Sequence, residues 1–176
     1  EREKAQPGEV GVEVRDLENT SEWNKKMRDK ITFSVRRGEI LGVAGVEGNG
    51  QRELVDMLFN LDVPDGGTAT VQGQSLIGKS QDKIRELGVS LIPEDRMLYG
   101  IAGAGTIEEN VISDRFSKPE FNKGPLFDMK AIHNESETLI RDYQILCKSP
   151  KQQVKMLSGG NIQKVVVARE FSSDPT

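Results

Sequence analysis

Residues 40–50, Ile-Leu-Gly-Val-Ala-Gly-Val-Glu-Gly-Asn-Gly, decide the fold expected for this 176-residue chain. Residues 40–44 are a continuous apolar run, which is typical of a strand covered on both faces. Closely spaced glycines follow, and over residues 51–60 the apolar side chains recur at helical spacing. The order strand, glycine loop, helix predicts an α/β fold with residues 40–44 as a central strand.

The glycine loop favours phosphate binding, because successive glycine N–H groups can turn toward one point at the positive end of the helix dipole. The phosphate-loop pattern is Gly, four residues, Gly, Lys and Ser/Thr, but here Gln51 stands at the lysine position and Arg52 at the hydroxyl position. Each lost charge-assisted contact weakens nucleotide binding by about 1.5–3 kcal/mol. The loop is therefore a degenerate nucleotide site or, equally, a tight strand-to-helix turn. Its candidate residues are Gly45, Val46, Glu47, Gly48, Asn49, Gly50, Gln51 and Arg52.

Further strands are predicted on both sides of this unit. Val10, Val12 and Val14 alternate with polar or glycine residues, and residues 31–35 alternate in the same way, which predicts two half-buried strands. We also expect a short strand at residues 68–72 and a buried strand at residues 88–92. The charged, Pro- and Gly-containing residues 1–9 predict a linker.

The chain becomes helical in character after residue 105. Thr106 and Glu109 have the spacing of a capping box, which predicts a helix through Ile112. From Asp128 onward, apolar residues at offsets of seven, eight and eleven predict a longer helix with one apolar face. Residues 106–147 are therefore expected to form a helical subdomain.

A second glycine motif precedes a stretch of valines near the C-terminal end. Ser-Gly-Gly at a helix start presents a hydroxyl group and unhindered amides to an anion. By propensity alone the valines at 165–167 favour a strand. The candidate residues of this motif are Leu157, Ser158, Gly159, Gly160, Asn161 and Gln163.

Together the two glycine motifs resemble those of the ATP-binding cassette (ABC) family. Residues 157–163 look like its signature motif, with Asn161 where many members have Gln, and residues 45–52 look like its phosphate loop in degenerate form. Residues 92–96, Ile-Pro-Glu-Asp-Arg, stand where the family has its Q-loop, with Glu94 at the glutamine position. The combination is similar to the second ATPase half of bacterial tandem subunits that power sugar and nucleoside importers.

This resemblance implies a P-loop NTPase-like α/β fold, in which the ABC core sheet carries an antiparallel β subdomain and a helical subdomain. The implied divisions are a linker at 1–9, the ATP-binding core with the β subdomain at 10–105, the helical subdomain at 106–156, and the signature motif with its following helix at 157–176. The chain ends at Thr176, before the family's strand with the magnesium-binding aspartate and catalytic glutamate. We therefore expect an incomplete core sheet, no catalytic residue or metal ligand in this chain, and no ATP hydrolysis by the chain alone.

The resemblance also implies a function, that of a nucleotide-binding domain in a bacterial sugar or nucleoside importer. ATP and Mg²⁺ would act in the assembled transporter, where this signature motif completes the ATP site of an upstream ABC domain of the same polypeptide. Transmembrane permease subunits and, indirectly, a solute-binding protein would be its partners, at the cytoplasmic face of the inner membrane. The alternative is a non-transport regulatory or binding module that kept the fold and lost nucleotide turnover.

Composition argues against several other classes of protein. The formal charge of −4, with both signs interspersed, supplies no basic field for a nucleic-acid backbone. Cys147 and His133 are the single cysteine and the single histidine, so neither an internal disulfide nor a Cys/His zinc cluster can form. The apolar runs are far shorter than the roughly 20 residues that span a bilayer.

Expected roles can be stated for four further residues, with alternatives for the first two. Trp23 would stack on adenine, as aromatic residues early in ABC domains do, or anchor a polar loop at the surface. Glu94 would contact a membrane subunit, the nucleotide site or only solvent. We expect His133 at the surface of its helix and Cys147 packed as a small apolar group near a helix end.

Overall fold

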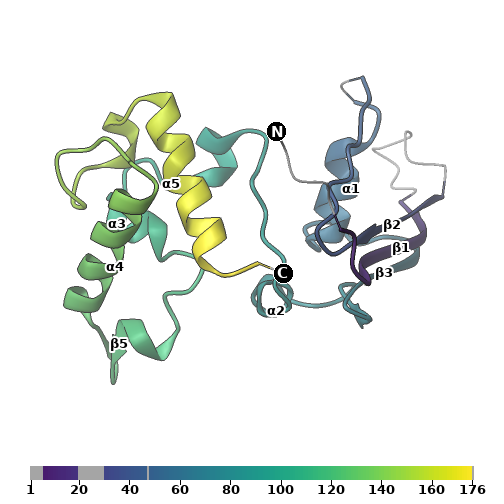
Figure 1. The fold of residues 1–176 in the computed structure, drawn as a ribbon, viewed down its shortest axis with the longest axis horizontal. Coiled ribbons are helices and arrows are strands. Elements are labelled where there is room, and N and C mark those ends of the chain that lie inside the picture. The colour runs from purple at the N-terminus through teal and green to yellow at the C-terminus, as the bar shows by residue number, and fades with distance from the viewer. Residues whose placement is uncertain (1–5, 20–29, 47, 176) are drawn as a thin grey trace. The chain divides into compact units, whose positions relative to one another are not determined.

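The computed structural model describes residues 6–19, 30–46 and 48–175. These residues form two compact units, which divide between Val89 and Ser90. Figure 1 draws both, with the strands of the first unit in purple to blue and the last helix of the second in yellow. Trp23 and Glu47 lie outside the described residues.

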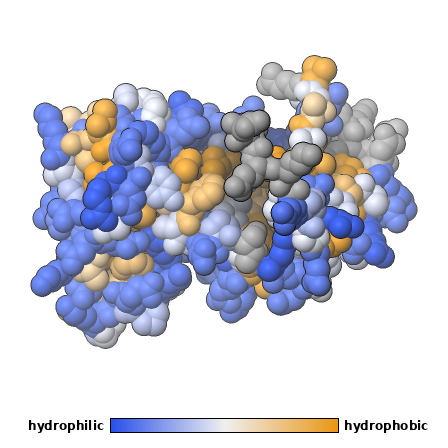
Figure 2. All heavy atoms as spheres, viewed as in Figure 1, coloured by the Kyte–Doolittle hydropathy of each residue, from blue (hydrophilic) through white to orange (hydrophobic). Residues whose placement is uncertain are grey.

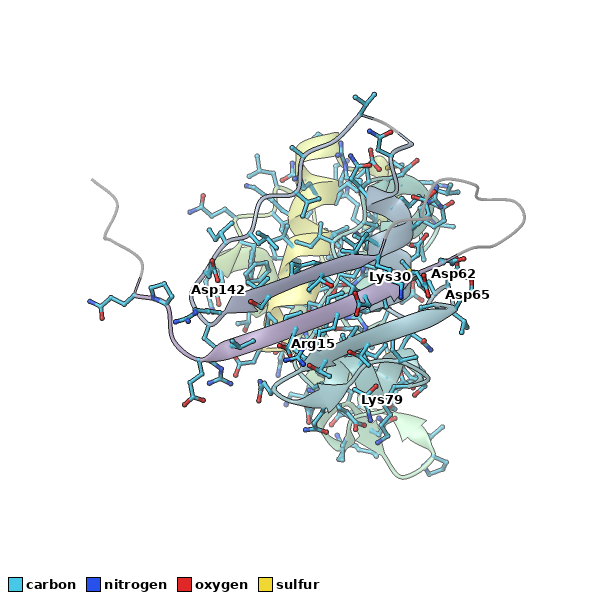
Figure 3. The ribbon with its side chains drawn as sticks, turned by 90° about the vertical axis from the view of Figure 1, so that its right-hand side faces the viewer. Arg15, Lys30, Asp62, Asp65, Lys79 and Asp142 are labelled. Atoms are coloured by element: carbon cyan, nitrogen blue, oxygen red, sulfur yellow. The ribbon has the colours of Figure 1, made fainter. Side chains whose placement is uncertain are left out.

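An antiparallel sheet with the strand order β2-β1-β3-β4 forms much of the first unit. Its strands are β1 (Val10–Glu18), β2 (Ile31–Arg36), β3 (Gly66–Val71) and β4 (Gln74–Ser75). Val14 of β1 lies opposite Phe33 of β2 on one side and Ala69 of β3 on the other. The strands expected at residues 10–14, 31–35 and 68–72 are thus confirmed, and Figure 3 shows them side by side with Arg15 labelled.

A β-bulge in β1 explains a break in its apolar alternation. Val14 and Leu17 are both fully buried although they are three residues apart. The register of β1 shifts between these two residues, and Asp16 between them has a positive φ of 48°. An extra residue in one strand turns the following side chains to the other face, which returns Leu17 to the core.

Among its described residues, the first unit also contains two helices, α1 (Gln51–Leu58) and α2 (Gln81–Glu86). The helix expected over residues 51–60 is confirmed, two residues shorter than its apolar pattern. Leu54 and Met57 are buried, whereas Val55 is 39% exposed, because positions three apart share a helix face and adjacent positions do not. Arg85 of α2 lies over the ring of Phe59, 5.3 Å from its centroid.

The expected central strand at residues 40–44 is wrong, as is the expected strand at residues 88–92. Residues 39–46 and 89–93 have no regular secondary structure, and Ile40 is 95% exposed. A buried parallel strand requires hydrogen-bonded neighbours at its edges and layers on both faces. Neither run pairs with a strand among the described residues.

The segment that follows Val89 is instead held by a helix of the second unit. The hydroxyl of Ser90 donates to the main-chain oxygen of Glu170 over 3.0 Å, and the N–H of Leu91 donates to Glu170 Oε2 over 3.2 Å. The Glu170 side chain is fully buried and also pairs with Arg169 over 2.9 Å. The Glu170 carboxylate thus accepts from the backbone N–H of Leu91, which would otherwise need a neighbouring strand as its hydrogen-bond partner.

The second unit consists mainly of helices around one apolar core. Its longer elements are α3 (Ile107–Val111), α4 (Met129–Asp142) and α5 (Gly159–Ser172). Three short helical segments, η1 (Arg96–Gly100), η2 (Pro119–Phe121) and η3 (Val154–Met156), and a small hairpin of β5 (Asn122–Lys123) with β6 (Leu126–Phe127) connect them. The core is formed by buried residues from several elements, among them Ile107, Val111, Ile132, Leu139, Val154, Ile162 and Val165. The face of the molecule shown in Figure 2 is largely hydrophilic, with apolar residues among the polar ones.

Local capping signals explain where these helices begin. The Thr106 hydroxyl oxygen accepts from Glu109 N–H over 3.2 Å, and Glu109 Oε2 accepts from Thr106 N–H over 2.7 Å, so the predicted capping box is confirmed. Asp128 caps α4 through the N–H groups of Lys130 and Ala131. The long helix expected from residue 128 is likewise confirmed.

The helix at α5 forms in spite of its valines. Val165 and Val166 are each 1% exposed, and residues on several faces of α5 are buried. Packing of this kind outweighs intrinsic propensities, which differ by less than about 1 kcal/mol per residue among ordinary residues. The helix that the family resemblance implied after Ser158 is therefore confirmed.

Candidate functional site

The glycine loop leads into α1 with two residues in the left-handed region. Gly48 has a φ of 81°, and Gly50, the N-cap of α1, has a φ of 99°. The N–H of Asn49 donates to the Val46 carbonyl oxygen over 3.1 Å, which closes a turn. The loop therefore has the tight, glycine-dependent entry to a helix that both sequence interpretations require.

The side chain of Gln51 folds back over this loop. Its Nε2 donates to the Val46 carbonyl oxygen at 3.5 Å, at the limit of a hydrogen bond. A Cβ atom on Gly45 would lie 2.1 Å from the same Nε2 atom, so the carboxamide occupies the space that a side chain at residue 45 would take. The residue at the lysine position thus directs a neutral amide at the loop's own backbone.

Arg52, at the hydroxyl position of the loop pattern, interacts along its own helix. Its Nε lies 3.6 Å from Asp56 Oδ2, one turn further on. Burial raises the pKa of the Asp56 carboxyl, and the Arg52 charge acts in the opposite direction. A guanidinium cannot replace a hydroxyl as the ligand of a metal cation, because the guanidinium and the cation are both positively charged. The loop can therefore bind a phosphate through its glycine N–H groups, but it lacks the positive charge that a lysine would add.

The second glycine motif is an ordered helix start. Leu157 is buried in the core, while Ser158, Gly159 and Gly160 are exposed at the N-terminus of α5. The first N–H groups of a helix have no intrahelical acceptor and carry the positive end of its dipole. A Cβ atom on Gly160 would meet nothing within 4 Å, so the space in front of this residue is open. The helix start can receive an anionic group.

Asn161 fixes the Ser158 hydroxyl at this helix start. The Ser158 oxygen accepts from Asn161 Nδ2 over 2.9 Å and from Asn161 N–H over 3.5 Å. Asn161 Oδ1 in turn accepts from the N–H of Leu146 over 2.8 Å. A hydroxyl has two acceptor positions and one donor, so these contacts leave its hydrogen to be donated outward.

The remaining predicted site residues lie at the surface of the second unit. Gln163 is exposed on α5, and Glu94 is exposed just before η1. Arg96 ends the Ile-Pro-Glu-Asp-Arg segment, and its sequence context indicates no role for it. Arg96 NH2 lies 3.2 Å from the position of a Cβ atom on Gly159. No local pattern links Arg96 to the second glycine motif, so only the fold reveals this proximity.

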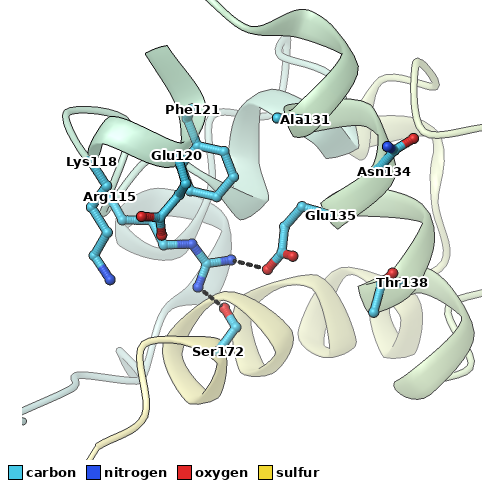
Figure 4. A pocket seen from close by; sticks show the side chains of 9 residues that line it. All are labelled: Arg115, Lys118, Glu120, Phe121, Ala131, Asn134, Glu135, Thr138 and Ser172. Atoms are coloured by element: carbon cyan, nitrogen blue, oxygen red, sulfur yellow. Dashed lines mark hydrogen bonds and ion pairs between the residues drawn. The ribbon is translucent and has the colours of Figure 1, made fainter.

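A pocket of about 410 Å³ lies elsewhere in the second unit, between the region of η2, α4 and the end of α5. Arg115 lines it and pairs with Glu135 over 3.0 Å, with a further hydrogen bond to Ser172 (Figure 4). Its guanidinium also lies 5.8 Å from the centroid of the Phe121 ring. Lys118 and Glu120 also line the pocket, so two basic and two acidic side chains balance, and the lining carries no net positive charge to favour an anion.

His133 and Cys147 lie in the second unit, outside both glycine motifs. His133 Nδ1 lies 3.1 Å from Oε2 of the buried Glu108, and its side chain is 39% exposed on α4. Cys147 packs against the core cluster as expected, and burial raises the pKa of its thiol.

Among residues 6–19, 30–46 and 48–175, no group of three or more His, Cys, Asp or Glu side chains is placed to hold a metal ion. No helix in these ranges has the length and apolar character to cross a bilayer.

Comparison with protein families and curated relatives gives consistent matches. The family model described as "ABC transporter" matches residues 28–176. The chain is 34% identical over 177 residues to a glucose import ATP-binding protein, TsgD13, of Haloferax volcanii, covering 99% of this chain and 32% of that protein. It is 34% identical over 176 residues to the nucleoside import ATP-binding protein NupA of Lactococcus lactis, covering 99% of this chain and 35% of that protein. The chain thus spans about a third of the length of these relatives.

Solved structures with the same fold are ATP-binding cassettes. The ADP conformation of MJ1267, a cassette of an ABC transporter, matches with a TM-score of 0.68 and 16% identity, covering 96% of this chain and 66% of that one. A post-hydrolysis dimer of the cassette MJ0796 matches with a TM-score of 0.70 and 17% identity, covering 93% of this chain and 70% of that one. At this identity the match establishes the fold, and it confirms the expected α/β class with a P-loop-type cassette architecture.

Proposed function

The chain belongs to the ABC transporter family, and from this premise we propose that it is a nucleotide-binding domain of an importer for sugars or nucleosides. The named relatives support this proposal, because the two quoted above are named as ATP-binding proteins of glucose import and nucleoside import. The transported solute itself is handled by other subunits in this proposal, so the residues described here do not select it.

The ordered start of α5 carries the proposal. Ser158 presents a hydroxyl hydrogen whose direction Asn161 sets, and the amides of Gly159 and Gly160 follow at the positive end of a 14-residue helix. Donors held in place before the reaction stabilise charge that develops in the transition state. We assign these three residues to the terminal phosphate of an ATP molecule bound by the upstream ABC domain of the same polypeptide.

The two half-sites are unequal in this proposal. The phosphate loop of this chain lacks the lysine charge, Gln51 lies over Gly45, and Arg52 is turned toward Asp56. This loop does not fit Mg²⁺, because it places a cation where a hydroxyl ligand is needed. ATP and Mg²⁺ are therefore assigned to the competent site, whose phosphate loop and metal ligands come from the partner domain.

Partners and location follow from the same assignment. We propose that the helical subdomain at 106–156 docks on transmembrane permease subunits and transmits domain closure to them. A solute-binding protein would act indirectly, on the far side of those subunits. The domain would then work as a peripheral protein on the cytoplasmic face of the inner membrane, without any nucleic-acid partner.

The second candidate is a regulatory or binding module without nucleotide turnover. The contact of Gln51 with the loop favours it, because this side chain fills space beside Gly45 rather than reaching for a phosphate. The parent reading frame separates the two candidates. A first cassette upstream and a neighbouring permease gene support the importer, and the absence of both supports the module.

The test is the ATPase rate of the reconstituted full transporter with two variants. Ser158→Arg removes a donor and places a bulky side chain at the phosphate, and loss of one such donor typically lowers the rate by about 10²–10³. Gln51→Ala deletes at most a neutral hydrogen bond of about 0.5–1.5 kcal/mol, so its effect should stay within about tenfold. If Gln51→Ala is as damaging as Ser158→Arg, or Ser158→Arg leaves the rate unchanged, the proposed function is wrong.

A further inference from the structure

Arg96 extends toward the start of α5. It is the first residue of η1, and its NH2 atom lies 3.2 Å from the position that a Cβ atom on Gly159 would occupy. Its own Cβ is equally close, at 3.2 Å, to the Cβ position of Gly100 at the end of η1. The Arg96 stem is therefore enclosed by its own turn, and its guanidinium lies beside the Ser158-Gly159-Gly160 segment.

The Arg96 charge has no partner in the described part of the chain. Its Nε is buried without a hydrogen-bond acceptor, and no described carboxylate forms an ion pair with the guanidinium. The adjacent Asp95 does not neutralise it, because Asp95 Oδ1 accepts from the N–H groups of Met97 and Leu98 over 2.9 and 3.0 Å. The side chain as a whole is only partly buried, so its terminal guanidinium nitrogens can still donate to an acceptor from outside this unit.

Three kinds of donor therefore gather at one helix start. The Ser158 hydroxyl keeps its hydrogen free to donate because its oxygen accepts from Asn161, Gly159 and Gly160 present helix-start amides, and Arg96 adds a full positive charge beside Gly159. We propose that Arg96 binds the terminal phosphate of ATP together with the second glycine motif, as an additional residue of that site. This inference rests on the function proposed above.

The chemistry of a guanidinium suits this role. Its planar fork matches phosphate oxygens in pairs, and charge-assisted bonds of this kind are about twice as strong as neutral ones. The γ-phosphate is present in ATP and absent from ADP. Arg96 should therefore favour ATP over ADP, whereas a residue that only supports the turn around Gly100 would affect both nucleotides equally.

The experiment measures the KM for ATP and the inhibition constant for ADP in the reconstituted full transporter. Arg96→Gln and Arg96→Met both remove the charge and keep an unbranched stem, and Arg96→Lys keeps the charge without the fork. Arg141→Gln is the matched control, because Arg141 is 73% exposed and pairs with its neighbour Asp142 over 2.9 Å. Two charge-removing variants are used so that misfolding of one does not leave the question undecided.

The charge-removing variants should raise the KM for ATP by about 10- to 100-fold, the loss expected for a charge-assisted contact to phosphate. The ADP inhibition constant should stay within about twofold, and Arg96→Lys should recover part of the loss. An equal rise for ATP and ADP, or values like those of Arg141→Gln, would overturn the inference. Ser158→Arg in the same assay separates the two proposals: if it abolishes turnover while Arg96→Gln resembles the control, only the role of Arg96 fails.

Discussion

Asn161 Nδ2 donates to the Ser158 hydroxyl oxygen over 2.9 Å, while Asn161 Oδ1 accepts from the N–H of Leu146 over 2.8 Å. A single carboxamide thus connects the helix-start serine of α5 to the segment that follows α4. Because one end of Asn161 is held by backbone, the direction in which Ser158 can donate is set by the fold of the second unit.

Asn161→Ala should therefore weaken the site without removing its donors. We expect the ATPase rate of the full transporter to fall by up to about tenfold, the cost of losing a neutral hydrogen bond. Arg141→Gln is again the control, because Arg141 is 73% exposed and lies outside both glycine motifs. Asn161→Gln should retain more activity than Asn161→Ala. Equal rates for Asn161→Ala and Arg141→Gln would contradict this role of Asn161.

Thr106→Ala should destabilise the second unit by about 1 kcal/mol, because it removes both hydrogen bonds of the Thr106 hydroxyl, although the bond from the N–H of residue 106 to Glu109 remains. Ser80 provides the comparison, since it is the N-cap of α2 and its side chain makes no capping hydrogen bond. Ser80→Ala should change the unfolding free energy by a few tenths of a kcal/mol or less. Urea unfolding followed by circular dichroism measures both, and equal effects would argue against the capping box as a stabilising contact.

Gly67→Ala should be one of the more destabilising glycine substitutions in the sheet. Gly67 has a φ of 85°, and an added Cβ would lie 2.3 Å from the Asp16 carbonyl oxygen, a backbone atom that cannot easily move. Gly73→Ala is the control, because Gly73 has a φ of 76° with open space around it. Left-handed backbone costs about 1–2 kcal/mol, and overpacking adds about 1–3 kcal/mol at Gly67 only. Similar urea midpoints for the two variants would contradict this steric argument.

Cys147 should react slowly with iodoacetamide in the folded chain at pH 7.5. Burial raises the pKa of its thiol, so the reactive thiolate is less populated than in an exposed cysteine. The alkylation rate should increase as the pH rises, and it should increase at constant pH when guanidinium unfolds the chain. Mass spectrometry gives an unambiguous readout, because this is the single cysteine. Equal folded and unfolded rates at pH 7.5 would show that the thiol is not protected.

Features encoded within a few residues could be predicted from the sequence. The cap at Thr106 acts on an N–H group three residues away, so the residue types themselves indicate where α3 begins. Asp128 and Ser158 cap α4 and α5 over the same short range, although the helix after Ser158 was expected from the family resemblance and not from its residue types. The alternation in β1 and β2 also depends only on the period of the strand. Both glycine motifs are predictable for the same reason, since a glycine-rich entry to a helix is a local pattern.

Tertiary structure decided the features that join distant parts of the chain. An apolar run at residues 40–44 is compatible with a buried strand, but a strand forms only where neighbours supply hydrogen bonds, and those residues are exposed and unpaired with any described strand. Packing also decided that Glu170 would bind Leu91, that Val165 would lie in a helix, and that Arg96 would lie beside Gly159. Such contacts depend on how elements pack against one another, and the energy of packing is absent from any short stretch of sequence taken alone.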